Sequence, residues 1–376
     1  MNILITGSGG FIGRNLSQHL KAVGFSDLLL YDVQSDLSRL DQYAAEADFV
    51  FHLAGVNRPA ADAGFEENHR FTRALIESLK KGKRNPPVLM TSSTQALLDN
   101  PYGHSKRKAE ALVMEYGRET GAAIHQFRLP GVFGKWCRPN YNSVVATFCH
   151  NVSRGLPVRV DDPDSPLTLV YIDDVLNAFT AALRGEAGTR DGFCEVSPVH
   201  HLTVGKLLDI IQGFRDARQS LLLHDMADPL TRKLYAAYLS NLPEDGFLAT
   251  LQEHQDQRGT FAECLKSASG GQVSVNITKP GMTKGGHWHH TKAEKIVVVC
   301  GSALLRFRRL GDDRVFLYTV SSEKLEIVDI PPGYVHDMTN TGSGDMVMLI
   351  WASQIFNPEL PDTYPAAIKS PPREGE

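Results

Sequence analysis

The pattern of apolar residues changes near residue 246, and this change limits the possible folds more than any other feature of the chain. Up to about residue 180, short apolar runs such as 3–5 and 28–31 alternate with segments long enough to form crossover helices. Alternating strands and helices are typical of a parallel sheet covered on both faces. Between about 203 and 241 the pattern is helical, and the turn residues at 243–246 end it.

After residue 246 the sequence predicts strands joined by glycine, proline and aspartate turns. The apolar runs lie at 273–277, 296–299, 303–307, 315–320, 325–330 and 346–351. Many short strands of this kind favour a small barrel or jelly roll. We therefore expect an α/β domain at 1–245, an all-β domain at 246–365 and a disordered tail at 366–376.

The charge and cysteine content narrow the compartment and the class of partner. The chain has 39 Lys and Arg against 43 Asp and Glu, which gives no basic surface for nucleic acid or an anionic membrane. Its five cysteines form no Cys-x-x-Cys pair, which argues against disulfides and thiolate zinc sites and fits a reducing cytoplasm. No apolar run approaches the roughly 18 residues of a membrane span, and no export signal is recognisable. We expect a cytoplasmic protein that acts on a small molecule.

Glycines at 7, 10 and 13 follow the first predicted strand and precede a helix. At such a turn the backbone can approach a pyrophosphate, and the amides at the start of the helix, including those of Phe11 and Ile12, point at the anion. Asp32 ends the second strand about 20 residues on, where its carboxylate can bind an adenosine ribose and favours NADH. Arg14 could instead reach a 2′-phosphate, so both NADH and NADPH stay open.

The glycine spacing resembles that of the extended short-chain dehydrogenase/reductase family. Four further segments match motifs of this family in order and spacing: His52-Leu-Ala-Gly55, Thr91-Ser-Ser-Thr94, Tyr102-Gly-His-Ser-Lys106 and Tyr171-Ile-Asp-Asp174. The resemblance implies a Rossmann fold in which Leu53, Ala54 and Gly55 contact the coenzyme.

Tyr102 and Lys106 are four residues apart, which places them on one face of a helix. There the ammonium can lower the pKa of the phenol and bind the coenzyme ribose. Tyr102 can then give a proton to a ketone oxygen as hydride reaches the carbon. In the family a serine or threonine holds that oxygen. We assign this role to Ser93, while Ser92 and Thr94 stay open.

A second chemistry is indicated by His287, His289 and Glu294, which lie among strand residues at fixed offsets. Histidines two apart on a strand point to the same side. The stretch 281–301 resembles the first cupin motif, Gly-x5-His-x-His-x4-Glu-x6-Gly, and the second motif follows with His336. The resemblance implies that these four side chains converge inside a barrel.

Three imidazoles and a carboxylate suit a divalent transition metal with room for a substrate oxygen. Zinc is favoured because nothing else in the chain suggests oxygen chemistry, although iron, manganese or nickel fit the same ligands. Two alternatives stay open. His290 could replace one of the four, or the histidines could merely line an empty barrel.

The whole chain resembles the bifunctional CapF/WbjC type of capsule and O-antigen biosynthesis. The resemblance is local in several places: 52–59, 99–103, 138–144 and 286–292. It implies that the cupin epimerises C3 of a UDP-2-acetamido-2,6-dideoxy-4-ketohexose and that the reductase then reduces the C4 ketone. The product would be of the UDP-N-acetyl-6-deoxy-L-talosamine type, on the route to UDP-N-acetyl-L-fucosamine. Family members generally use NADPH, from which Asp32 is a departure.

The order of the two steps follows from chemistry, because C3–H is acidic only while C4 is a ketone. Lys292 and His290 are candidates for the group that abstracts the proton. A homodimer is expected by analogy. Substrate contacts are expected from Asn57, Arg58, Asn140 and Asn142.

Two other classes of function compete with this interpretation. The chain could be a monofunctional 4-ketosugar reductase whose cupin only binds sugar or dimerises. It could also be a nucleotide-sensing scaffold without catalysis, against which the intact Ser93, Tyr102 and Lys106 count.

Overall fold

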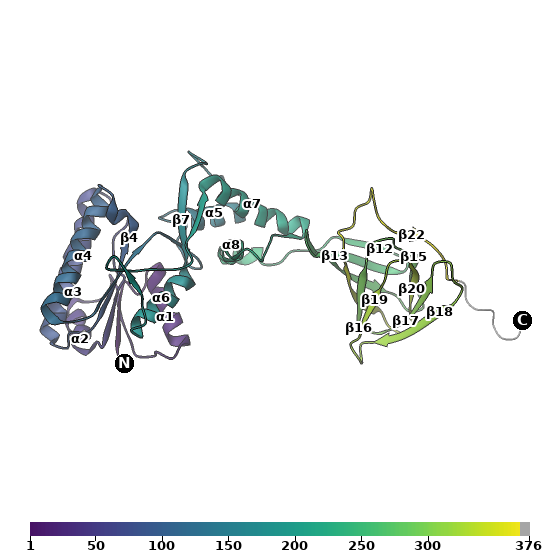
Figure 1. The fold of residues 1–376 in the computed structure, drawn as a ribbon, viewed down its shortest axis with the longest axis horizontal. Helices are drawn as coiled ribbons and strands as arrows, with labels where there is room; N and C mark the ends of the chain where they lie inside the picture. The colour runs from purple at the N-terminus through teal and green to yellow at the C-terminus, as the bar shows by residue number, and fades with distance from the viewer. Residues whose placement is uncertain (369–376) are drawn as a thin grey trace, which may run out of the picture. The chain divides into compact units, whose positions relative to one another are not determined.

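The structure, a computed structural model, describes residues 1–368. The end of the expected tail, 369–376, lies outside the described residues. The chain divides into two compact units (Figure 1). The first unit comprises Met1–Gln212 and Asp228–Glu244, and the second comprises Gly213–Ala227 and the chain from Asp245 onward. Among the described residues, no helix is long and apolar enough to cross a membrane.

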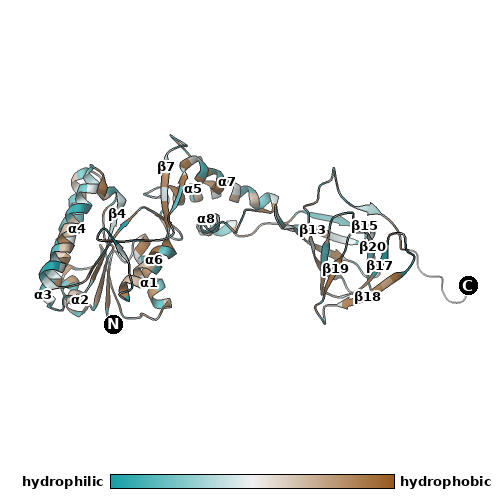
Figure 2. Ribbon diagram, viewed as in Figure 1, coloured by the Kyte–Doolittle hydropathy of each residue, from teal (hydrophilic) through white to brown (hydrophobic). Residues whose placement is uncertain are grey.

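The first unit is built on a five-stranded parallel sheet with the order β2-β1-β3-β4-β5. Its strands are β1 (Ile3–Thr6), β2 (Leu28–Tyr31), β3 (Phe49–His52), β4 (Val88–Ser93) and β5 (Ile124–Leu129). Figure 2 shows most of these strands in brown, because residues of a sheet that is covered on both faces are apolar throughout.

Helices cover both faces of this sheet. Ile3 and Ile5 point into one apolar cluster together with residues of α1 and α6, whereas Leu4 points into a second cluster with residues of α2, α3 and α4. The bounds are α1 (Phe11–Ala22), α2 (Leu37–Glu46), α3 (Glu66–Gly82), α4 (Pro101–Thr120) and α6 (Ile172–Leu183). The α/β domain expected from the sequence is confirmed.

Shorter elements complete the first unit. A three-stranded sheet has the order β10-β7-β6, and β8 pairs with β9. The bounds are η1 (Asp62–Phe65), η2 (Thr94–Leu97), β6 (Gly131–Phe133), α5 (Val144–Ser153), β7 (Pro166–Tyr171), β8 (Thr189–Arg190), β9 (Phe193–Cys194), β10 (His200–Thr203) and α8 (Pro229–Leu239). Helix α7 (Val204–Ser220) begins in the first unit and ends in the second.

The second unit consists of two sheets, with the orders β11-β13-β14-β21-β16-β19 and β18-β17-β20-β15-β22, and β12 pairs with β13. Their bounds are β11 (Leu222–Leu223), β12 (Glu253–Asp256), β13 (Gly259–Ser267), β14 (Gly271–Thr278), β15 (Thr283–Trp288), β16 (Glu294–Cys300), β17 (Ser302–Arg309), β18 (Val315–Ser321), β19 (Ile327–Ile330), β20 (Tyr334–Asn340), β21 (Met346–Ala352) and β22 (Tyr364–Pro365), with η3 (Glu244–Gly246) before them. This confirms the predicted all-β domain.

The interior of the second unit is partly polar. Strand β14 alternates between its two faces, and the buried face carries Gln272, Ser274, Asn276 and Thr278. Apolar residues such as Met348 and Phe307 fill another part of the interior. A barrel with polar groups turned inward is suited to hold a polar ligand rather than only its own core.

The last described residues remain attached to the second unit. The amide of Ala366 donates a hydrogen bond to the carbonyl of Gly286 at 2.9 Å, and Ile368 is buried. The chain is therefore packed as far as Ile368, within the segment expected as a tail.

Candidate active sites

The glycine loop between β1 and α1 forms a backbone cradle. A Cβ on Gly13 would lie 2.2 Å from the carbonyl oxygen of Gly7, and one on Gly7 would lie 2.8 Å from the backbone of Ala54. Gly7 also has a φ of +71°, which favours glycine. Gly10 caps the start of α1 without a side-chain hydrogen bond, and the first amides of a helix have no partner within it. These features fit the pyrophosphate of a dinucleotide.

The other residues predicted to bind the coenzyme lie around this cradle. Phe11, Ile12 and Leu53 pack against the apolar cluster beneath it. Gly55 leaves room for Lys106, whose Nζ would lie 3.1 Å from a Cβ at that position.

Asp32, at the end of β2, contacts the loop directly. Its Oδ2 accepts a hydrogen bond from the amide of Gly9 at 2.5 Å, and its Oδ1 accepts one from the amide of Val33 at 2.7 Å. Arg14 lies with its guanidinium 5.5 Å from the ring centroid of Trp136. In dinucleotide-binding folds a carboxylate at this end of the second strand can bind the adenosine ribose, and this role of Asp32 stays a prediction.

Helix α4 presents Tyr102 and Lys106 from its first turns. The helix begins where the side chain of Asn100 accepts a hydrogen bond from the amide of Gly103 and Pro101 occupies the first helical position. The Tyr102 hydroxyl donates to Oδ1 of Asn57 at 3.1 Å, and Nζ of Lys106 lies 5.8 Å from the Tyr102 ring centroid. The two side chains share one helical face, as the sequence predicted.

Burial controls the acidity of both groups. It raises the pKa of Tyr102 to about 12, an effect that the hydrogen bond with Ser93 opposes. It lowers the pKa of Lys106 to about 8. The expected lowering of the phenol pKa by Lys106 is therefore not found, because removal of the phenolate from water outweighs other influences.

Ser93 is the member of the serine and threonine cluster that lies beside Tyr102. Its neighbour Ser92 instead donates a hydrogen bond to Glu110 at 2.5 Å, and Glu110 is paired with Arg128 at 2.6 Å. Successive residues of a strand point to opposite sides, which explains why Ser92 contacts Glu110 and Ser93 contacts Tyr102. Ser93 therefore occupies the position from which a ketone oxygen beside Tyr102 could be held, while Thr94 begins η2.

The residues predicted to bind substrate are spread over two loops. Asn57 contacts Tyr102, while Arg58 is exposed. Asn140 and Asn142 are both exposed, and the amide of Asn140 donates to Thr147.

Tyr141 lies between these two asparagines, within the stretch 140–142 expected to contact substrate, but the sequence analysis did not single it out. Its hydroxyl is close enough to Tyr102 to raise the pKa of that residue, and the guanidinium of Arg138 lies 5.0 Å from its ring centroid. An aromatic residue between two predicted contacts was the available signal.

Replacing Gly13 with alanine is expected to weaken NAD(P)H binding about tenfold or more. The added Cβ meets the Gly7 carbonyl, which is backbone and cannot move without opening the cradle, and overpacking of this kind costs about 1–3 kcal/mol. Titration of NAD(P)H fluorescence measures the affinity. Gly188→Ala is the matched control, since a Cβ there meets no heavy atom within 4 Å. Equal affinities of the two variants would contradict the assignment of the loop.

In the second unit, four predicted ligands come together at one place. His287 lies on β15 opposite His336 on β20, His289 follows β15 directly, and Glu294 begins β16. One ligand atom from each residue lies within 4.8 Å of all the others. The register of β15 shifts between Gly285 and His287. This cluster of four is the group expected from the sequence.

Hydrogen bonds fix which nitrogens of the ligand histidines are free. Nδ1 of His289 donates to the carbonyl of Asp362 at 2.6 Å, and Nδ1 of His336 donates to the carbonyl of Tyr334 at 3.3 Å. Their Nε2 atoms lie 3.5 and 3.8 Å from Oε2 of Glu294. Within the described part of the chain, the buried Nε2 of His289 has no hydrogen-bond partner. An orphaned nitrogen beside a carboxylate fits a divalent transition metal.

The charge states also suit metal binding. Burial, assisted by the neighbouring histidines, lowers the pKa of His287 to about 4, and burial also lowers the pKa of His336. For Glu294, burial alone would raise the pKa, but the nearby His289, Lys292 and His336 together lower it. Neutral imidazoles and an ionised carboxylate are the forms that bind a metal.

His290 lies outside the cluster of four. Its ring contacts Trp288 and Tyr364, with centroids 4.4 and 4.9 Å away. It therefore does not replace any of the four ligands. Lys292, the other candidate for proton abstraction, donates from Nζ to Oγ1 of Thr363 at 3.0 Å and lies 3.7 Å from Oε1 of Glu294.

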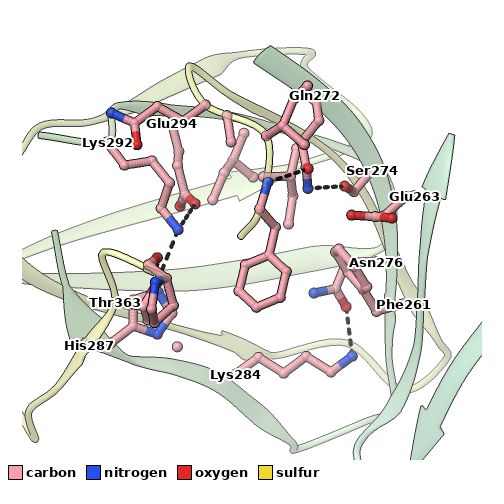
Figure 3. A pocket seen from close by; sticks show the side chains of 18 of the residues that line it. Phe261, Glu263, Gln272, Ser274, Asn276, Lys284, His287, Lys292, Glu294 and Thr363 are labelled. Carbon is pink, nitrogen blue, oxygen red and sulfur yellow. Dashed lines mark hydrogen bonds and ion pairs between the residues drawn. The ribbon is translucent and has the colours of Figure 1, made fainter. Parts of the chain in front are cut away.

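A cavity of about 500 Å³ opens onto these ligands. Figure 3 shows His287, Glu294 and Lys292 along one side of it, and Lys284 with Asn276 along another. The segment after β21 supplies further lining residues between 354 and 363. The volume lies within the range of small-molecule sites. A small molecule held here would contact those residues of the cluster that line the cavity.

Comparison with protein families matches residues 3–192 to the NAD dependent epimerase/dehydratase family and residues 254–364 to the polysaccharide biosynthesis C-terminal domain. The chain is 43% identical to UDP-2-acetamido-2,6-beta-L-arabino-hexul-4-ose reductase of Pseudomonas aeruginosa, over 98% of this chain and 99% of the relative. Its fold matches the crystal structure of the capsular polysaccharide assembling protein CapF from Staphylococcus aureus with a TM-score of 0.93, at 41% identity over 98% of this chain and 100% of that one.

Proposed function

Because the chain belongs to the NAD dependent epimerase/dehydratase family and, over nearly its whole length, to the CapF type, we propose that it is a nucleotide-sugar reductase that also epimerises its substrate. The barrel would invert C3 of a UDP-2-acetamido-2,6-dideoxy-4-ketohexose, and the first unit would then reduce the C4 ketone. The product would be of the UDP-N-acetyl-6-deoxy-L-talosamine type, used for capsule or O-antigen. One observation carries the proposal: Tyr102 lies beside Lys106 on one helix, and the same chain has a cavity with a cluster of four side chains that could hold a metal.

In the proposed epimerisation, the neutral amine of Lys292 takes the proton from C3. The C3–H bond breaks and its electron pair forms the enolate, whose charge gathers on the C4 oxygen. A water molecule then returns a proton to the opposite face of C3, and the hydroxide that is left takes the proton from the Lys292 ammonium, which restores the amine. A divalent metal, which we expect to be zinc, would be held by His287, His289, Glu294 and His336 and would supply a positive charge near that oxygen. Lys292 is favoured over His290 because it lines the cavity and His290 does not.

In the proposed reduction, Tyr102 gives its hydroxyl proton to the C4 oxygen. Ser93 holds the same oxygen by a hydrogen bond, and Lys106 binds the ribose of the coenzyme. A bound NADH or NADPH supplies the hydride that adds to C4. Asn57, which accepts a hydrogen bond from Tyr102, and Tyr141 would contact the sugar.

The reaction is tested by incubating the metal-loaded protein with the UDP-4-ketohexosamine in D₂O without coenzyme, followed by NMR. We expect deuterium to appear at C3. Addition of NAD(P)H should then yield a reduced product inverted at C3. Coenzyme oxidation without deuterium at C3 would instead identify a monofunctional reductase and overturn the epimerase half.

Replacing Lys292 with methionine is expected to slow the deuterium exchange about 10²–10⁴-fold, the range for loss of a general base. Lys295→Met is the matched control, because Lys295 lies on the next strand, β16, and pairs with Asp329 of β19 at the surface. If both variants exchange C3 at the rate of the unaltered protein, another group abstracts the proton.

A further inference from the structure

We propose that Asp362 is a positioning residue of the metal site, which fixes the orientation of His289 and the loop that follows it. This inference rests on the proposed metal site and identifies what holds that site in place. Asp362 lies 73 residues along the chain from His289, in the segment between β21 and β22, where its neighbours Pro361 and Thr363 line the cavity.

The carboxylate of Asp362 binds three successive backbone amides. Oδ1 accepts a hydrogen bond from the amide of His290 at 2.8 Å. Oδ2 accepts hydrogen bonds from the amides of Thr291 at 3.0 Å and Lys292 at 2.8 Å, and from the Thr291 hydroxyl at 3.0 Å. An anion held by successive amides is a strong and directional contact. It ties the turn between β15 and β16 to the cavity wall.

The backbone of the same residue contacts a metal ligand. The carbonyl of Asp362 accepts the hydrogen bond from Nδ1 of His289 at 2.6 Å. A carbonyl can only accept, so this contact places the proton on Nδ1 and leaves Nε2 free to bind a metal. Asp362 has a φ of +41°, a conformation that few residues other than glycine adopt. The bonds of the side chain can hold this conformation, which aims the carbonyl at His289.

The neighbouring residue extends the effect to Lys292. Oγ1 of Thr363 accepts a hydrogen bond from Nζ of Lys292 at 3.0 Å. A displaced Asp362 would therefore loosen both a metal ligand and the proposed base. Side chains that act through a histidine ligand in this way usually change metal affinity 10–100-fold when removed.

The test compares zinc affinity, by competition with a chromogenic chelator, among Asp362→Ala, Asp362→Asn and Glu359→Ala. We expect a loss of about 10–100-fold for alanine and a smaller loss for asparagine, which tolerates positive φ and keeps one acceptor oxygen. Glu359 is exposed on the same segment, so its variant should bind zinc as the unaltered protein does.

A second measurement separates positioning from simple stabilisation. The absorption spectrum of the Co²⁺-loaded protein reports ligand geometry, and we expect it to change in Asp362→Ala at temperatures far below unfolding. Wild-type zinc affinity and an unchanged cobalt spectrum in that variant would overturn the role of Asp362 and leave the metal site intact. Failure of the unaltered protein to bind zinc would overturn both.

Discussion

Replacing Tyr102 with phenylalanine is expected to slow reduction of the 4-ketosugar about 10²–10⁴-fold. The change removes one oxygen atom, and with it the proton that the C4 oxygen needs as hydride arrives. NAD(P)H should still bind, because the coenzyme cradle and Lys106 are unchanged. The measurement is the rate of NAD(P)H oxidation at saturating substrate, together with a fluorescence titration of the coenzyme.

Two controls define the result for Tyr102. Tyr43→Phe removes a hydroxyl from a tyrosine of helix α2 and should leave the rate unchanged. Deuterium exchange at C3 should also persist in Tyr102→Phe, since that step is assigned to the second unit. Full reductase activity in the variant would show that another group protonates the ketone.

Combined replacement of Glu294 and His336 by alanine is expected to abolish zinc binding and C3 exchange. Two of the four ligands are lost, and the remaining histidines cannot complete a site of four. Zinc content is measured by elemental mass spectrometry, and exchange at C3 is measured by NMR in D₂O. Reduction of a substrate already inverted at C3 should continue, because Ser93 and Tyr102 are unaltered.

His290→Ala is the matched control for the metal ligands. His290 is adjacent to His289 in sequence, but its ring packs against Trp288 and Tyr364. This variant should keep zinc and exchange C3. Loss of zinc in His290→Ala, or its retention in the double variant, would contradict the set of four ligands.

The sequence predicted those features that depend on local periodicity. Strand β1 and the glycines after it could be placed because strand residues and a tight turn leave a clear pattern. His287 and His289 could be placed on one side because strand side chains alternate. The convergence of His336 with them required the resemblance to cupins, since no local pattern specifies how distant strands pair.

Other features could not be predicted because they depend on burial and on distant contacts. The pKa of Tyr102 is raised rather than lowered, since the depth of a side chain is a property of the assembled fold. The bond from Ser92 to Glu110 also depends on a contact between distant residues, and the role of Ser93 stays a prediction. Asp362 is 70 residues or more from the amides that it binds, and nothing in its sequence neighbourhood indicates them.

The chain passes between the two units more than once, and this limits how the units can be separated. Residues 213–227 belong to the second unit although they precede 228–244, which belongs to the first. Strand β11 pairs in parallel with β13, and Phe214 is fully buried. A single scission near 245 would thus leave part of one unit covalently attached to the other. Truncation of the chain at one point therefore cannot yield two complete units. To produce either unit alone, residues 213–227 must be moved in the sequence so that they stay with the second unit.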